Sequence, residues 1–285
     1  MDISVVGAGR VGTALAVLLS GAGHRVAAVS GREGTAERAA RYLPGTPVVG
    51  DAEAAGAAEV VIFGVPDGLI EPTAAAVASA LRAEAAVLHL SGALGLDALK
   101  PSEAAGAMPV AVHLLQTFPS VDAALDRVPG SAAAVTARAE EGFALGERLA
   151  VDVGARPFRL PDEARPLYHA GAVLASNAVV ALLGLAEQAF REAGIEDPVA
   201  RFLPLTRASV ENTGALGPGD ALTGPVVRGD AATVERNLAA LAEHAPDAVA
   251  PYVALSRAAA DLAVRGGRLD AEGRAVIEEV LARWT

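Results

Sequence analysis

A glycine-rich segment near the N-terminus has the spacing of a loop that holds phosphate groups. It follows the short apolar run Ile3–Val6 directly and opens a helical pattern. In such a unit Gly7 permits a tight turn, Gly9 lets the backbone approach a pyrophosphate, and Gly12 lets helix and strand pack closely. The alternative is a glycine turn without a ligand. We expect dinucleotide binding by Gly7, Ala8, Gly9, Arg10, Val11 and Gly12.

The residues after the second apolar run indicate which dinucleotide the loop would take. NAD-binding proteins place a carboxylate there for the ribose 2′-hydroxyl, whereas this chain has no carboxylate before Glu33. Ser30 offers a hydroxyl and Arg32 a planar guanidinium, both suited to the 2′-phosphate of NADP. The sequence therefore favours NADP over NAD, unless Arg32 is one more solvated arginine in an arginine-rich chain.

Polar residues also end two later apolar runs. One run ends in Val65, Pro66 and Asp67, and the next contains His89 and is followed by Ser91. In doubly wound sheets the carboxyl ends of the strands line the ligand crevice. We therefore predict cofactor contacts at Val65, Pro66, Asp67 and Ser91, with Asp67 and His89 as candidates for the cleft. Alternatively, Pro66 and Gly92 only terminate strands.

Five histidines are available as proton donors for a hydride transfer, which needs a group that protonates or polarises the developing anion or amine. His24 precedes a predicted strand and His244 lies near a predicted helix end, so both are expected at the surface. His89, His113 and His169 remain. His113 lies near the end of an apolar run in the polar segment HLLQTFP, which fits a site residue.

His169 begins a polar trio on an otherwise apolar helical segment. Ser176 follows seven residues later and Asn177 eight residues later. At about 100° per residue these two lie within roughly 20° and 80° of His169, so the three side chains can face one cleft. The alternative is that Ser176 and Asn177 only form hydrogen bonds across a helix interface.

A third polar cluster lies in the segment LTGPVVRGD (222–230). Thr223 precedes a Gly-Pro turn ahead of a predicted helix, and Arg228 is a candidate clamp for a substrate carboxylate. Equally, Asp230 caps the helix that follows and Arg228 is solvated.

The predicted elements that position these residues change character along the chain. Up to about residue 160, short β-branched runs alternate with Ala-rich helical stretches, which is typical of a doubly wound, parallel α/β sheet of the Rossmann type. The predicted strands are Ile3–Val6, Arg25–Val29, Pro47–Val49, Val60–Val65, Ala86–Leu90, Pro109–Leu114, Ala132–Thr136 and Arg156–Leu160. The predicted helices among them lie near Val11–Ser20, Thr35–Tyr42, Glu71–Arg82 and Ala137–Val151.

After Pro161 the apolar residues recur at helical spacing and no strand pattern appears. We therefore predict an NADP-binding domain over 1–160 and an all-α domain over 161–285. The predicted helices of the second domain cover Arg165–Ala193, Asp197–Asn212, Ala231–His244, Asp247–Arg265 and Ala271–Trp284.

Composition excludes several classes of protein. A formal charge of −11 with only 6 Phe, 3 Tyr and 1 Trp argues against a nucleic-acid partner. The absence of cysteine excludes disulfides, thiolate zinc sites and Cys nucleophiles, and we predict no metal site.

The N-terminus lacks a basic secretory region, and Ser176 and Asn177 interrupt the apolar run Ala170–Ala186. We expect a cytoplasmic protein without a membrane span.

Five segments together resemble a known family. They are GAGRVG (7–12), HLSGA (89–93), HLLQTFP (113–119), YHAGAVLASN (168–177) and LTGPVVRGD (222–230). In this order they look like the predicted oxidoreductases with a Rossmann-like N-terminal domain and a helical C-terminal domain of unknown function. The resemblance covers nearly the whole chain.

That family is similar in layout to ketopantoate reductases, pyrroline-carboxylate reductases and β-hydroxyacid dehydrogenases, with a helical part like the C-terminal domain of 6-phosphogluconate dehydrogenase. The resemblance implies NADP or NAD in the first domain and a helical second domain for substrate binding and homodimerisation. Where related enzymes carry a helix lysine four residues before an asparagine, this chain has Val173 before Asn177. Their lysine acid is therefore missing.

The leading hypothesis is an NADPH-dependent reductase of a small carbonyl acid, with 2-dehydropantoate favoured. His113 or His169 would supply the proton, Asn177 and Thr223 would orient the substrate with Ser176 nearby, and Arg228 would hold a carboxylate. A second hypothesis is an imine reductase, because an iminium needs less help from a strong acid. A third is a non-catalytic NADP-binding module.

Overall fold

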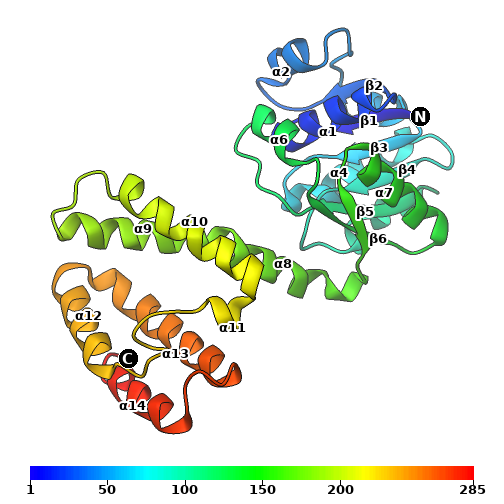
Figure 1. Ribbon diagram of the computed structural model, residues 1–285. Helices are drawn as coiled ribbons and strands as arrows, with labels where there is room; N and C mark the ends of the chain where they lie inside the picture. The colour runs from blue at the N-terminus through cyan, green and yellow to red at the C-terminus, as the bar shows by residue number, and fades with distance from the viewer. The chain divides into compact units, whose positions relative to one another are not determined.

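The computed structural model describes residues 1–285 and divides the chain into two compact units, Met1–Leu174 and Ala175–Thr285. Figure 1 shows the sheet in the first unit and helices alone in the second. The predicted all-helical region begins at residue 161, but α8 (Arg165–Ala175) lies almost wholly in the first unit. The boundary of the sequence-defined domains at 160/161 stays a prediction.

The first unit contains one seven-stranded sheet, in the order β2-β1-β3-β4-β5-β6-β7. Neighbouring strands are parallel except for β5 and β6, which are antiparallel. The expected Rossmann-type α/β fold with a helical C-terminal part is therefore confirmed. The strands are β1 (Asp2–Val6), β2 (Arg25–Ser30), β3 (Val60–Phe63), β4 (Ala86–His89), β5 (Met108–Leu114), β6 (Ala132–Ala137) and β7 (Arg156–Arg159).

Two details of the predicted strands differ in the structure. The sheet is mostly parallel, but β6 runs antiparallel to β5, and this pairing continues past β5, where Leu115 N donates to Ala132 O. A buried apolar run carries no information about strand direction. The predicted strand Pro47–Val49 does not form. This run makes only an isolated parallel bridge, between its Val48 and Val29 of β2.

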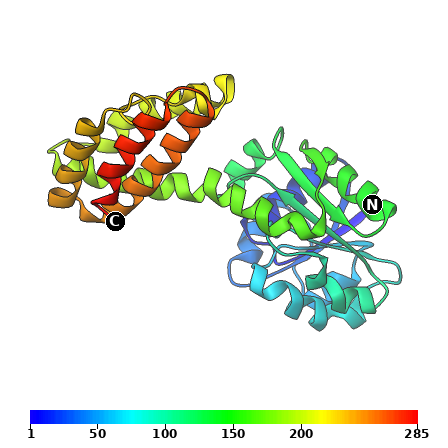
Figure 2. The same ribbon diagram turned by 90° about the horizontal axis from the view of Figure 1, so that it is seen from below.

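Alternating side chains of the sheet enter two separate cores. In β3, Val60 and Ile62 belong to one core, and Val61 and Phe63 to the other. The first core includes residues of α1 and α7, and the second includes residues of α3 and α4. Figure 2 shows helices on both faces of the sheet. Burial on both faces explains why these strands read as continuous apolar runs.

The helices of the first unit agree with the predicted ones at most positions. The helix predicted over Glu71–Arg82 ends earlier as an α-helix, at Val77, and the one predicted from Ala137 starts at Glu140 because β6 extends to Ala137. Three short helices, α3, α5 and α6, were not predicted. The helices are α1 (Arg10–Gly21), α2 (Thr35–Tyr42), α3 (Asp51–Gly56), α4 (Ile70–Val77), α5 (Lys100–Ala104), α6 (Val121–Arg127), α7 (Glu140–Asp152) and α8.

The second unit is a helical bundle around a small apolar core. The core includes Val234, Leu238, Val253, Ile277 and Leu281, from three helices. No strand occurs in this unit, as predicted. Its helices are α9 (Asn177–Glu192), α10 (Pro198–Leu216), α11 (Pro218–Ala221), α12 (Ala231–His244), α13 (Val249–Arg265) and α14 (Ala271–Ala282).

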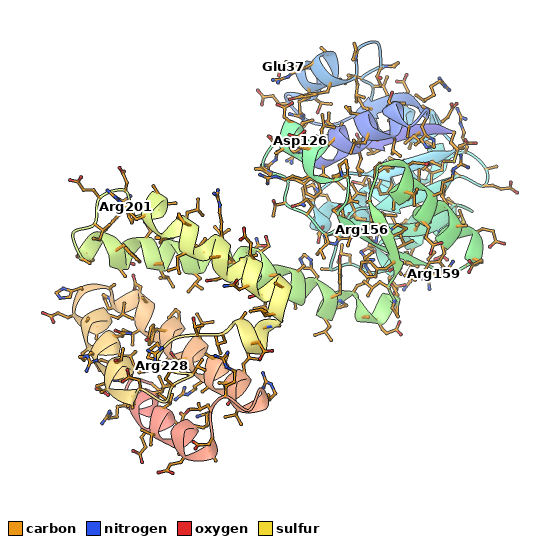
Figure 3. The ribbon with its side chains drawn as sticks, in the orientation of Figure 1. Glu37, Asp126, Arg156, Arg159, Arg201 and Arg228 are labelled. Atoms are coloured by element: carbon orange, nitrogen blue, oxygen red, sulfur yellow. The ribbon has the colours of Figure 1, made fainter.

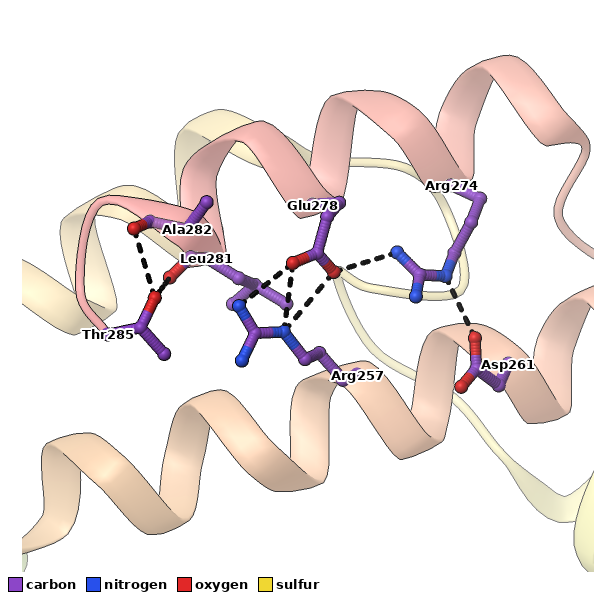
Figure 4. A network of polar contacts seen from close by, with 7 residues as sticks. All are labelled: Arg257, Asp261, Arg274, Glu278, Leu281, Ala282 and Thr285. Atoms are coloured by element: carbon purple, nitrogen blue, oxygen red, sulfur yellow. Dashed lines mark hydrogen bonds and ion pairs between the residues drawn. The ribbon is translucent and has the colours of Figure 1, made fainter.

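An ion-pair network joins α13 and α14. Glu278 accepts from Arg257 and Arg274, and Arg274 also donates to Asp261 at 2.9 Å (Figure 4). The Arg257 and Arg274 guanidiniums hold the pKa of Glu278 below its usual range. Because these side chains are partly exposed, the network contributes modestly to stability and chiefly aligns the two helices.

The helix predicted over Arg165–Ala193 is interrupted. Ser176 has φ −129° and ψ −74°, outside the helical region, so the chain forms α8 and α9 with a break between them. The stretch Asp162–Glu192 has the length and hydropathy that a membrane span requires, and none of its most apolar window is buried. Large apolar side chains are exposed on α9 and α10, including Val180, Leu205 and Val210.

Candidate functional site

The glycine loop after β1 is tightly packed at two of its glycines and open at the third. Gly7 has φ +90°, and a Cβ there would lie 2.5 Å from Val65 Cγ1. A Cβ on Gly12 would lie 2.9 Å from Gly7 O, whereas one on Gly9 would meet no atom within 4 Å. Gly7 and Gly12 are thus required by packing, and Gly9 leaves the backbone accessible.

The N-terminus of α1 lacks an internal cap. Its N-cap residue is Gly9, which has no side chain to accept from the first turn, and that turn contains no acidic residue. The first N–H groups of a helix have no partner within the helix. The donors around Arg10, Val11 and Gly12, together with the positive end of the helix dipole, are therefore suited to an anion.

A cavity of about 590 Å³ opens beside this loop. Of the predicted cofactor residues, Gly7, Ala8, Gly9, Arg32, Val65 and Pro66 line it. Arg10 lies at the start of α1, where its guanidinium donates to Pro119 O at 3.1 Å. The cavity is also lined by residues that the sequence did not indicate, namely Gly31, Glu33, Thr35, Arg38, Asp51, Gly64, Leu69 and Thr73.

Ser30 contributes to the loop through its backbone. Its carbonyl oxygen accepts from Gly7 N at 3.1 Å and Ala8 N at 2.7 Å. Its hydroxyl is buried without a hydrogen-bond partner and does not line the cavity. Strand alternation turns this side chain into the protein interior, so the predicted hydroxyl contact with a phosphate does not fit the position of Ser30.

Arg38, which the sequence did not single out, also lines the cavity beside the glycine loop. Its Nε donates to Ala8 O at 3.1 Å and its Nη2 to Thr35 Oγ1 at 3.1 Å. These bonds hold the guanidinium at the wall of the cavity that also contains Arg32. The spacing of Thr35 and Arg38, one turn apart on α2, was the signal that could have identified them.

The residues at the ends of β3 and β4 are joined by hydrogen bonds. Ser91 Oγ donates to Asp67 Oδ2 at 2.7 Å and accepts from Leu94 N at 3.0 Å. His89 is fully buried and its Nε2 lies 3.2 Å from Gly95 O. Burial, with the charge of Arg165 as a smaller cause, lowers the pKa of His89 to about 4. His89 therefore stays neutral inside the protein and does not fit a cleft residue.

His113 and His169 are brought together over Gly92. Their ring centroids are 5.9 Å apart. A Cβ on Gly92 would lie 2.5 Å from His169 Nδ1 and 2.8 Å from His113 Nε2, so only glycine fits beneath the two rings. The sequence singled out both histidines but carried no sign that they pack on the same glycine.

Tyr168, which the sequence reasoning missed, orients His113. The Tyr168 hydroxyl lies 2.8 Å from His113 Nδ1. Burial, followed by the charges of Arg165 and His169, lowers the pKa of His113 to about 4, while Asp67 acts in the opposite direction. Burial raises the pKa of Tyr168, so its hydroxyl keeps the proton and donates it to Nδ1. The proton of neutral His113 is then on Nε2, the nitrogen that faces Gly92.

The remaining predicted residues belong to the second unit. Ser176 occupies the break before α9 and Asn177 is the first residue of α9. With the helix interrupted, the regular 100° spacing no longer relates them to His169, and a common cleft stays a prediction. Thr223 is exposed and lines an apolar cavity of about 990 Å³ within this unit.

Arg228 is exposed (Figure 3), whereas Asp230 caps α12 by accepting from Thr233 N at 3.0 Å. Of the two alternatives for this segment, the cap is present. A carboxylate clamp at Arg228 stays a prediction. No group of three or more His, Asp or Glu side chains is arranged to hold a metal ion.

Two family models match the chain. Residues 1–114 match a Rossmann-like domain, and residues 131–259 match a domain of unknown function, DUF2520. The predicted pairing of a Rossmann-like domain with a helical domain of unknown function is confirmed. No curated protein matches the chain.

Several solved structures share the fold. Protein BF3122 from Bacteroides fragilis, described provisionally as an NADP oxidoreductase, has a TM-score of 0.76 at 24% identity, covering 91% of this chain and 98% of its own. A reductive aminase from Aspergillus terreus in complex with NADPH and ethyl-5-oxohexanoate has a TM-score of 0.68 at 19% identity, covering 98% of both chains. The Streptomyces aurantiacus imine reductase has a TM-score of 0.59 at 19% identity, covering 99% of both. At 19–24% identity, this structural similarity shows that the fold is shared and shows nothing about activity.

Proposed function

We propose that the protein is an NADPH-dependent reductase of a small carbonyl acid, with 2-dehydropantoate as the favoured substrate. The observation that carries the proposal lies within the first unit. The open glycine loop with its arginine-lined cavity and the His113–His169 pair both lie at the carboxyl ends of parallel strands. In doubly wound sheets this edge is where cofactor and substrate meet.

The glycine loop and the arginines of the cavity support NADPH as its ligand. The pyrophosphate would lie on the N-terminus of α1 above Gly9, and the 2′-phosphate would be held by Arg32 and Arg38, with Thr35 as a hydroxyl donor. Glu33 and Asp51 also line the cavity, but the two residues directly after β2 are Gly31 and Arg32. The guanidiniums of Arg32 and Arg38 therefore favour NADPH over NADH. The bound cofactor would supply the hydride for reduction of the carbonyl carbon.

The histidine pair would handle the proton that balances the hydride. His113 is neutral, so it serves as a hydrogen-bond donor from Nε2 that polarises the carbonyl oxygen. His169 would deliver the proton to that oxygen as it gains charge. Asn177 and Thr223 would orient the substrate, with Ser176 beside them, and Arg228 would hold its carboxylate; these four roles rest on the sequence pattern.

The direct test is NADPH oxidation by the purified protein with a panel of 2-oxo acids headed by 2-dehydropantoate, and with NADH in parallel. Turnover of one acid with NADPH preferred is the expected result. His113→Ala and His169→Ala should each reduce turnover while leaving NADPH affinity unchanged. Normal turnover in both variants would refute the assignment of the acid. Tight NADPH binding that no acid or imine converts to turnover would instead indicate the non-catalytic module.

Imine reduction is the second candidate. It is favoured by the absence of the helix lysine at Val173 and by the likeness in fold to an imine reductase and a reductive aminase. A preformed iminium already carries the positive charge that a carbonyl acquires only through an acid. The panel should therefore include cyclic imine acids and carbonyl–amine mixtures. Activity with these and none with 2-oxo acids would favour this candidate.

A homodimer completes the proposal. Val180 on α9 and Leu205 and Val210 on α10 expose most of their apolar side chains, and exposed apolar patches mark interaction surfaces. We assign this surface to a second copy of the chain and not to lipid, and we place the protein in the cytoplasm. Sedimentation at micromolar concentration without detergent should give a dimer, and a monomer would refute the assignment.

A further inference from the structure

Arg165, the first residue of α8, is completely buried, and all of its hydrogen bonds go to uncharged acceptors. Its Nε donates to Leu94 O at 2.5 Å, its Nη1 to Thr136 Oγ1 at 2.9 Å, and its Nη2 to Ser91 O. The guanidinium therefore connects α8 to β6 and to both ends of the segment Ser91–Leu94.

A charge in this position is expensive for the fold. A guanidinium removed from water without a carboxylate in contact loses much solvation energy, and the N-terminus of a helix adds partial positive charge. Burial lowers the pKa of Arg165, opposed at longer range by Asp162, Tyr168 and Asp67. An apolar residue would avoid the desolvation of a charge but would leave Leu94 O, Thr136 Oγ1 and Ser91 O without this donor. The arginine therefore matters for the backbone that it binds.

Two carboxylates bind this segment and the residues just after it. Asp162 Oδ1 accepts from Leu96 N at 3.0 Å, and Asp67 Oδ2 accepts from Ser91 Oγ at 2.7 Å. Both carboxylates also counteract the lowering of the Arg165 pKa by burial. Gly92, which lies in this segment, is the residue on which His113 and His169 pack.

We propose that Arg165 is a positioning residue: it fixes the backbone of Ser91–Leu94 and thereby sets the contact of Gly92 with His113 and His169. The inference rests on the proposed function, in which these histidines meet the substrate. Arg165 itself is enclosed by protein and does not line the cofactor cavity.

Because Arg165 is charged, its removal should change the pKa of His113, which the loss of an uncharged packing residue would not do directly. The groups around His113 are Arg165, Tyr168 and His169 of α8, His89 of β4, and Asp67 after β3. Arg165 and His169 lower the pKa of His113, and Asp67 raises it. Removal of the guanidinium should therefore raise the pKa of His113 from about 4 toward the ordinary value of 6.5, without reaching it because burial remains the largest cause.

The test is an NMR titration of the histidine side chains of the full-length protein between pH 5 and 8, without cofactor or substrate. The variants are Arg165→Met, which removes charge and donors, and Arg165→Lys, which keeps the charge but cannot make the three-way contact. Arg156→Met is the matched control, because Arg156 is an exposed arginine of the same unit that donates to Gly130 O.

In the wild type and in Arg156→Met, His113 should stay neutral down to pH 5. In Arg165→Met it should begin to protonate above pH 5, and the His169 ring signals should shift. Arg165→Lys should keep His113 neutral while still shifting His169. If a folded Arg165→Met or Arg165→Lys left both histidine spectra unchanged, the proposal would be wrong.

Because the titration needs no turnover, its outcome is separate from that of the proposed function. If the reductase assay succeeds, Arg165→Lys should lower kcat at least tenfold and change KM for NADPH less than twofold, since the cofactor cavity does not include Arg165. Should Arg165→Met fail to fold, Arg165→Lys still decides the positioning role through the His169 signals and this kinetic comparison.

Discussion

The Tyr168 hydroxyl is 2.8 Å from Nδ1 of His113, and the two rings meet edge to face with centroids 5.5 Å apart. The contact joins α8 to β5. Because His113 is neutral at pH 7 and Tyr168 keeps its proton, the contact sets the imidazole tautomer. In the proposed reaction it determines which His113 nitrogen can donate to the substrate.

Replacement of Tyr168 by Phe should disturb this orientation while keeping the ring. His113 Nδ1 would lose its donor, which costs about 1–3 kcal/mol for a buried group and leaves the tautomer free to change. We expect a lower free energy of unfolding in urea and at least a tenfold loss of kcat, with KM for NADPH unchanged. Tyr252→Phe, in the second unit, is the control. Wild-type turnover in Tyr168→Phe would show that the tautomer does not matter.

A methyl group on Gly92 should separate the two histidines. It would lie 2.5 Å from His169 Nδ1 and 2.8 Å from His113 Nε2, closer than atoms can approach without movement. Gly92→Ala should therefore abolish most turnover while NADPH binding, measured by fluorescence, stays within about twofold of wild type. Gly21→Ala is the control, because a Cβ there meets no atom within 4 Å. An active Gly92→Ala would contradict the assignment of the histidine pair.

Cofactor preference should depend on Arg38 as well as Arg32. Loss of one guanidinium from a phosphate typically costs on the order of 1–3 kcal/mol, which corresponds to about tenfold or more in Kd. Arg38→Ala should weaken NADPH binding by that factor and change NADH binding little, as measured by calorimetry. Arg41→Ala, an exposed neighbour paired with Asp122, should change neither. Equal losses for the two cofactors would mean that Arg38 only supports the loop through Ala8.

Acid should destabilise the protein through its buried histidines. The pKa of His89 is about 4 in the folded protein against an ordinary 6.5, so between these values the unfolded chain binds a proton that the folded chain does not. Stability due to His89 is therefore complete above pH 6.5 and is lost as the pH falls toward 4, by about 3 kcal/mol. His113 acts in the same direction over the same range.

Urea unfolding of the wild type and His89→Gln at several values between pH 4 and 7 measures this contribution. Glutamine can still donate to Gly95 O but does not titrate, so the variant should lose less stability on acidification. Carboxylates titrate equally in both proteins and cancel in the comparison. Identical pH dependence would show that His89 is not held neutral by the fold.

The sequence by itself determined the glycine loop, the order of most strands and helices, and the change to an all-helical chain after Pro161. These features depend on neighbours in sequence: Gly7, Gly9 and Gly12 act within one strand-loop-helix unit, and apolar periodicity reports which face of an element is buried. For the same reason the sequence identified His113 and His169 as polar residues at the ends of apolar segments.

Only the tertiary structure decided how these residues combine. It turned Ser30 inward, placed Arg38 in the cavity that Arg32 also lines, and packed His113 of β5 and His169 of α8 on Gly92. It also buried Arg165, which in the sequence is one arginine among many. Such contacts join residues far apart in the chain, and their geometry follows from the packing of whole strands and helices, which local spacing does not encode.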